Sequence, residues 1–100
     1  MLTNTNISSL PASRELDALV AEHVMHQPID KFALAQGVLY NIPPYSTSIA
    51  AAWEVVEKLA VVGSAVLKKE NGWICVLGLE TADANTAPLA ICRAALKVVG

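Results

Sequence analysis

The chain has few charged residues and few aromatic ones. Asp, Glu, Lys and Arg make up 16% of its 100 residues, against about 25% in an average soluble domain, and aromatic residues make up 5%. The net charge is −2, and Lys68 and Lys69 are the only adjacent basic pair. A protein that binds duplex nucleic acid needs a basic stripe that displaces counterions from the phosphates. The composition therefore argues against that class.

Long apolar runs are absent as well. No uninterrupted apolar stretch reaches the roughly 18 residues that a membrane-spanning helix needs, so we expect no membrane association. The chain does not open with a charged segment followed by an apolar run, which is the pattern of a secretory signal peptide. We therefore expect a cytoplasmic protein.

The motifs of common catalytic and metal sites are also missing. No GxSxG, HExxH, CxxC, Walker or GxGxxG pattern occurs. His23 and His26 could supply two ligands, but a zinc site needs three or four, and the alternative is one half-buried and one exposed histidine. Cys75 and Cys92 lie in apolar stretches, which is typical of buried free thiols, and the alternative is a disulfide. We expect no catalytic residue, no metal, no cofactor and no enzymatic activity.

Small apolar residues make up much of what is present. Hydrophobic residues account for 54% of the chain, with alanine and valine prominent, so the core is built from small side chains and its elements can pack closely. One hundred residues is the size of one domain. Because so little polar surface is available to cover the outside, we expect the protein to form a homo-oligomer.

The first part of the chain predicts an arm followed by a helix. Residues 1–8 are polar and aperiodic, so we expect a flexible N-terminal arm, with one domain over residues 9–100. Ser9 is the predicted N-cap of a helix that has Pro11 in its first turn and runs to about Met25. Its apolar stripe is Leu16, Leu19, Val20, His23 and Val24.

Two more helices are predicted. Pro43 and Pro44 break the chain, and Ser46 or Thr47 then caps a helix that runs to about Val62. Its apolar stripe is Ile49, Ala52, Trp53, Val56, Leu59 and Ala60. The last helix is capped by Thr86, with Pro88 in its first turn, and is apolar around most of its circumference.

The strongest strand signal is a hairpin. Residues 64–69 and 73–79 flank an Asn-Gly turn signal, and the second strand is a nearly continuous apolar run, which indicates burial on both faces. Residues 29–42 could form two strands, but their alternation is weak. Residues 80–87 are predicted to be a polar loop. The pattern predicts an α/β (α+β) fold class, a compact αβα sandwich with three helices flanking a small, mainly antiparallel sheet.

The segment Pro43–Trp53 is the candidate binding site. Tyr45, Ser46 and Thr47 place an aromatic face and hydroxyls at a predicted helix start, where free N–H groups and the positive end of the helix dipole favour anions. The tyrosine could stack on a base. The alternative is an ordinary helix cap, with Tyr45 packed back on the helix.

Arg14 and Arg93 are the arginines of otherwise apolar helices. Each could pair with a ligand phosphate, or with a carboxylate such as Asp17 or Glu57. The predicted ligand-binding set is therefore Tyr45, Ser46, Thr47, Arg14 and Arg93.

Three blocks, in order, resemble the phage αβα-sandwich domain family: SRELDALVAEHVM (13–25), PPYSTSIAAAWEVVEKL (43–59) and NTAPLAICRAALKVVG (85–100). Together they cover nearly half the chain. The resemblance implies a bacteriophage protein in which helices flank a sheet.

A phage-like sequence without catalytic motifs, but with a candidate anion site, suggests a phage accessory protein. We expect it to inhibit a host anti-phage defence by sequestering a small nucleotide-derived signal. The alternative is a protein–protein interaction module that binds a host or phage protein through an apolar surface. A small nucleotide hydrolase is a third possibility.

Overall fold

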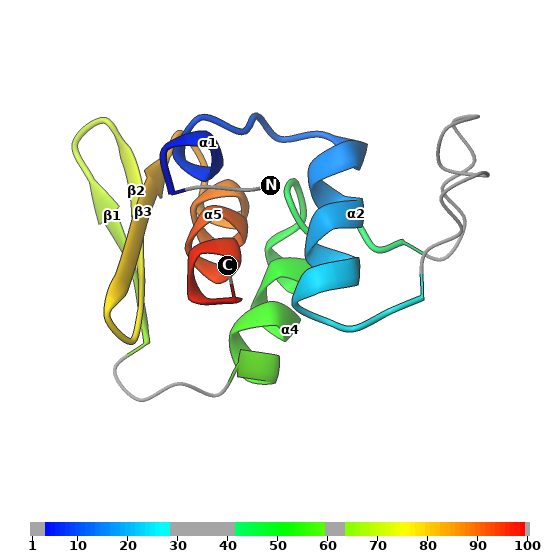
Figure 1. Ribbon diagram of the computed structural model, residues 1–100. Coiled ribbons are helices and arrows are strands. Elements are labelled where there is room, and N and C mark those ends of the chain that lie inside the picture. Colours follow the sequence, from blue (N-terminus) through cyan, green and yellow to red (C-terminus); the bar gives the residue numbers. More distant parts are fainter. Residues whose placement is uncertain (1–3, 29–41, 60–63, 100) are drawn as a thin grey trace.

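The chain is built around its last helix. A computed structural model describes residues 4–28, 42–59 and 64–99. Its elements in chain order are α1 (Asn4–Ser8), α2 (Arg14–His23), α4 (Ile49–Leu59), β1 (Ala65–Lys69), β2 (Gly72–Leu77), β3 (Glu80–Ala84) and α5 (Ala87–Val99). Helix α5 contacts each of the other elements. It lies between the sheet on one side and α2 and α4 on the other (Figure 1).

Helix α5 can occupy the centre because it is apolar on nearly all sides. Its buried residues are Ala87, Pro88, Leu89, Ala90, Ile91, Cys92, Ala94, Ala95 and Leu96. The predicted cap is confirmed, since the Leu89 backbone N–H donates to Thr86 Oγ1 at 3.4 Å. Among the described residues, no helix is both long enough and apolar enough to cross a membrane.

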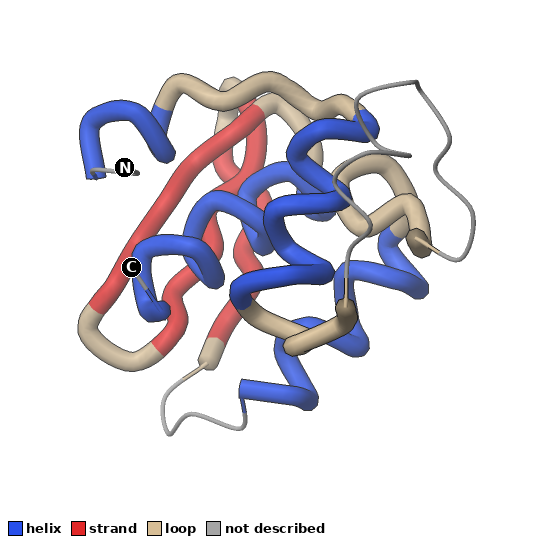
Figure 2. The backbone as a smooth tube through the Cα atoms, turned by 45° about the vertical axis from the view of Figure 1, so that its right-hand side comes forward, coloured by secondary structure: helices blue, strands red, loops and turns tan. Residues whose placement is uncertain are grey.

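The three strands form one antiparallel sheet in the order β1-β2-β3, and they run side by side in Figure 2. The predicted hairpin of β1 and β2 is confirmed, with Val66 opposite Cys75. Gly72 starts β2 with φ of 146°. A Cβ atom at this position would lie 2.4 Å from the carbonyl oxygen of Ala84, so only glycine fits between the turn and β3.

Strand β3 corrects the predicted loop over residues 80–87. A two-residue turn, with Gly78 at φ of 64°, connects β2 to β3. The sequence ETADA resembles a loop because β3 is an edge strand whose side chains mostly face solvent, while Ala82 is buried. Lys97 Nζ and Arg93 Nη1 donate to the carbonyl oxygens of Thr81 and Asp83, each at 2.9 Å.

The prediction that β2 is buried on both faces is wrong for the described residues. Cys75 and Leu77 are fully buried, whereas Ile74 and Val76, on the opposite face, are only partly buried. Figure 1 shows the described helices on one side of the sheet. The predicted α+β fold class is confirmed as a compact sandwich of described helices and an antiparallel sheet.

The start of the chain is more ordered than its composition predicts. Asn4–Ser8 forms a short helix instead of an aperiodic arm, because Ile7 is buried against the core. The predicted N-cap, Ser9, instead donates from its Oγ to Asn6 O at 3.0 Å. Ser13 is the N-cap of α2, and its Oγ accepts from the Leu16 N–H at 3.1 Å. The helix ends at His23, slightly before the predicted Met25.

Helix α4 begins later than predicted. Ser48 supplies the cap in place of Ser46 or Thr47, since its Oγ accepts from the Ala51 N–H at 3.3 Å. The residues before it form a turn in which the Ser48 N–H donates to Pro44 O at 2.9 Å. The predicted end of this helix at Val62 and the two strands predicted within 29–42 lie outside the described residues, apart from Ile42.

The two thiols are buried in the core, as predicted. Cys75 and Cys92 are free and fully buried. Burial raises the pKa of Cys75 from 9.0 to about 11. Burial also raises the pKa of Cys92, with a further contribution from the negative charge of Asp17.

Because α5 packs closely on all sides, enlarging one of its alanines should be costly. Ala94 is fully buried, and we expect Ala94→Leu to lower the free energy of unfolding by about 1–3 kcal/mol through overpacking. The matched control is Ala50→Leu, on the exposed face of α4, which should change stability by less than about 0.5 kcal/mol. Urea denaturation measures both, and equal effects would contradict the central role of α5.

The buried thiols should make the protein less stable in alkali. Above a pH of about 9 the thiols ionise in the unfolded chain but stay protonated in the native one, so stability falls as pH rises. The loss should reach at most about 1.4 kcal/mol per pH unit for each thiol. Urea denaturation between roughly pH 8 and pH 10 measures it. Cys75→Ala should show a smaller slope than wild type, and an unchanged slope would contradict the assignment.

Candidate functional site

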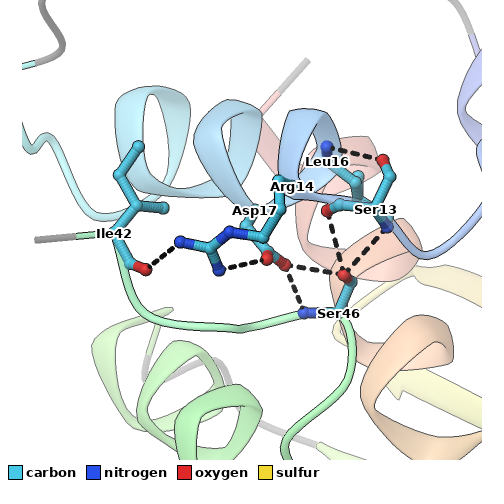
Figure 3. A network of polar contacts seen from close by, with 6 residues as sticks. All are labelled: Ser13, Arg14, Leu16, Asp17, Ile42 and Ser46. Atoms are coloured by element: carbon cyan, nitrogen blue, oxygen red, sulfur yellow. Dashed lines mark hydrogen bonds and ion pairs between the residues drawn. The ribbon is translucent and has the colours of Figure 1, made fainter. Parts of the chain in front are cut away.

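A buried carboxylate joins α2 to the segment that precedes α4. Asp17 is 1% exposed and Ser46 is fully buried. Asp17 Oδ1 accepts from the Ser46 backbone N–H at 2.7 Å and from its hydroxyl at 2.6 Å. Asp17 Oδ2 pairs with Arg14 Nη1 at 2.7 Å (Figure 3).

The network extends in both directions along the chain. Arg14 Nη2 donates to Ile42 O at 2.6 Å, and the Ser13 N–H donates to Ser46 Oγ at 3.2 Å. No buried side-chain polar atom in the described residues lacks a hydrogen-bond partner. We call Ser13, Arg14, Asp17, Ile42 and Ser46 the Asp17 network, and its role is to fix the segment before α4 against the start of α2.

This network determines what the predicted binding residues can reach. Ser46 already uses its hydroxyl and its N–H within the core. Tyr45 is 3% exposed, and burial, followed by the charge of Glu54, raises its pKa. Only Thr47, of the three predicted residues in this segment, is exposed. The aromatic face and the Ser46 hydroxyl are therefore turned into the core and not toward a ligand.

The two arginines serve different parts of the fold. Arg14 pairs with Asp17, as one of the two alternatives predicted. Arg93 donates from Nε and Nη2 to Leu10 O, at 2.9 and 2.7 Å, and from Nη1 to Asp83 O. Arg93 thereby ties the segment before α2 to the edge of the sheet. The structure brings Arg14 and Ser46 together on Asp17, but it does not bring Arg93 to them.

An apolar cavity lies elsewhere, where α4 and α5 begin beside the sheet. Its volume is about 540 Å³, within the range of small-molecule sites. We call it the two-tryptophan cavity. Its lining residues are Ile49, Trp53, Val66, Trp73, Thr86, Ala87 and Pro88.

The cavity exposes large apolar side chains to solvent. Ile49 is 52% exposed and Trp53 is 47% exposed, and both belong to the first two turns of α4. Trp73 stands on β2 across the cavity, and Lys68 Nζ lies 5.3 Å from its ring centroid. Exposed apolar side chains gathered in one concave site are typical of a surface that binds something.

Two helix starts meet at the cavity. Ile49 and Ala87, both in the lining, are the first residues of α4 and α5. The first turns of two helices are therefore part of the lining, and the Lys68 ammonium group lies beside Trp73, another lining residue. Indole rings can stack with an aromatic ring, and an ammonium group or a helix start can attract an anion.

Sequence reasoning missed these residues because it assigned Trp53 and Ile49 to the core stripe of their helix. The buried residues of α4 are instead Ala52, Val55 and Val56. A tryptophan that directly follows three alanines in its helix was the available signal, since a small-residue core leaves little room for an indole. Among the described residues, no group of three or more potential metal ligands lies together.

Comparisons with known proteins found similarity to phage proteins. The model of the phage ABA sandwich domain family matches residues 18–96. A crystal structure of a phage protein from Bacillus cereus ATCC 14579 is similar to this chain, with a TM-score of 0.72 and 30% sequence identity, covering 88% of this chain and 86% of that one. No curated protein sequence matches the chain. The matched range contains every residue of the two-tryptophan cavity but begins just after Asp17.

The Asp17 network should matter for stability. Asp17→Ala removes the acceptor for Arg14 Nη1 and for the Ser46 hydroxyl, and it leaves the buried Ser46 N–H without its acceptor, so we expect the free energy of unfolding to fall by at least about 1–3 kcal/mol. Ser46→Ala should cost about 1–3 kcal/mol. Glu15→Ala, an exposed change in the same helical turn, is the control and should cost under about 1 kcal/mol. Chemical denaturation measures all three, and a neutral Asp17→Ala would contradict the assigned role.

Proposed function

The chain belongs to the phage ABA sandwich domain family and is a phage accessory protein, and from this premise we propose that it inhibits a host anti-phage defence by sequestering a small nucleotide-derived signal. It would act in the host cytoplasm as a homo-oligomer. The observation that carries the proposal is the two-tryptophan cavity. We propose it as the binding site in place of Tyr45 and its neighbours, which the sequence predicted.

The cavity suits the base of a nucleotide. Trp53 and Trp73 both line it, and stacking of a base on an aromatic side chain contributes about 1–3 kcal/mol. Such stacking tolerates different bases, because every base has a π face. The partly exposed Trp53 lies within the first two turns of α4, so a base could enter from solvent without rearrangement of the core.

The surroundings of the cavity suit a phosphate. Lys68 lies over the Trp73 ring, and the starts of α4 and α5 are part of the lining. These positive groups are adjacent to apolar walls, where the local dielectric is lower than in water and charge interactions are stronger. A nucleotide combines a flat base with phosphate groups, and it would use both features at once.

We propose that the ligand is held and released unchanged. The lining side chains are apolar except for Thr86, whose hydroxyl accepts the Leu89 N–H as a helix cap. None of the lining side chains is a carboxylate, an imidazole or a thiol, the groups that most often transfer protons in hydrolysis. Nucleotide recovered intact after the protein is denatured would support sequestration, and a cleaved product would indicate a hydrolase.

The same cavity favours a second candidate function, a protein–protein interaction module. Exposed Ile49 and Trp53 could receive an apolar side chain of a host or phage protein. A pull-down from host lysate distinguishes the two functions. A stoichiometric protein partner, lost in Trp53→Ala, would favour the module, and recovery of nucleotide without such a partner would favour sequestration.

Tryptophan fluorescence should report binding directly, because the chain has two tryptophans and both line the cavity. We expect cyclic dinucleotides or ADP-ribose-derived nucleotides to change the emission of the wild-type protein. Trp53→Ala should weaken binding roughly 5- to 150-fold in calorimetric titration, from the loss of one stacking contact.

The control for this experiment is Leu79→Ala. Leu79 is fully exposed at the turn between β2 and β3 and does not line the cavity, so its removal should leave affinity unchanged. Titrations without heat or emission change across these nucleotides would contradict the proposed function.

A further inference from the structure

The two edges of the sheet differ in whether side chains of α5 bond to their backbone. At the β3 edge, Lys97 and Arg93 of α5 donate to the backbone carbonyls of Thr81 and Asp83. These acceptors are therefore occupied, and the edge is protected against the addition of another strand. Among the described strands, β1 pairs with β2 alone and forms the other edge.

We propose that a second copy of the chain pairs with β1, antiparallel and with Leu67 opposite the partner's Leu67. In this register Val66 lies opposite the partner's Lys68, and Ala65 opposite the partner's Lys69. Like charges placed directly opposite each other destabilise a strand pair. Although β1 carries two lysines among its five residues, no lysine faces another lysine here.

The outer face of the sheet supports the same pairing. Leu67 is 56% exposed although it lies in a strand, and its register partner on β2 is Ile74. Pairing at Leu67 would bring the Leu67 and Ile74 side chains of both copies into one continuous apolar row. The low charge of the chain agrees with this, because little polar side-chain surface is available to cover such a row.

The pairing would also add a residue to the two-tryptophan cavity. Val66 lines the cavity from the inner face of β1. Residues directly opposite each other in an antiparallel pair share a face, with Cβ atoms about 4.5–5.5 Å apart. The partner's Lys68 would therefore stand beside Val66 and bring a second ammonium group toward the cavity. Its role toward a nucleotide phosphate rests on the proposed function, whereas the pairing itself does not.

Sedimentation velocity without any ligand tests the pairing. We expect a wild-type dimer, and we expect Leu67→Lys to weaken it at least about 100-fold, because it places two like charges together on the dimer axis. Leu79→Lys makes the same chemical change at a fully exposed turn and should leave the dimer intact. A wild-type monomer, or a dimer unaffected by Leu67→Lys, would overturn the proposal.

Cross-linking tests the register and does not depend on the Leu67→Lys variant folding. The native thiols are buried, so introduced cysteines are the accessible ones. Chains with Val66→Cys mixed with chains with Lys68→Cys should form a disulfide-linked dimer on mild oxidation. Either variant alone should form at least about 10-fold less, because the two copies of one position lie two residues out of register. Equal cross-linking of the single variants would overturn the register.

These outcomes are separable from those of the nucleotide titration. A dimer that binds no nucleotide would support the pairing and contradict the proposed function. A monomer that binds nucleotide would overturn the pairing and leave the proposed function supported.

Discussion

The structure depends on one buried charge. A carboxylate in the interior is tolerated only if its oxygens receive hydrogen bonds and its charge is paired, and Asp17 obtains both from Ser46 and Arg14. Because Ser46 and Arg14 lie on two parts of the chain, their hydrogen bonds to Asp17 also position the segment 42–46. Helix α4 begins three residues after Ser46, so the buried charge indirectly positions one wall of the two-tryptophan cavity. Structure and candidate function are therefore linked through one side chain.

Small side chains explain the rest of the architecture. Alanines on α5 let the sheet, α2 and α4 approach it from different sides, as the composition predicts. The same composition leaves few places in the core for an indole, although Tyr45 is buried there. The two indoles instead stand where α4, α5 and the sheet meet, partly open to solvent. An exposed apolar surface is thus a consequence of how tightly the core is packed.

The sequence predicted correctly those structural elements that are determined by residues close together in the chain. The α5 helix with its Thr86 cap and the β1–β2 hairpin are of this kind, since the cap and the turn are encoded within a few residues. Strand β3 was missed because its polar residues are stabilised as a strand by pairing with β2, which no local signal reports. The predicted site failed for a related reason. Ser46 and Asp17 are 29 positions apart, and only the folded chain shows that the Ser46 hydroxyl is already bound.

The position of α5 in the chain has a consequence for folding. It follows every other described element in sequence, yet each of those elements packs on it. Before α5 is present, the sheet and the earlier helices lack the central helix against which each of them packs. Folding should therefore wait for α5, and most contacts should form together once it is present.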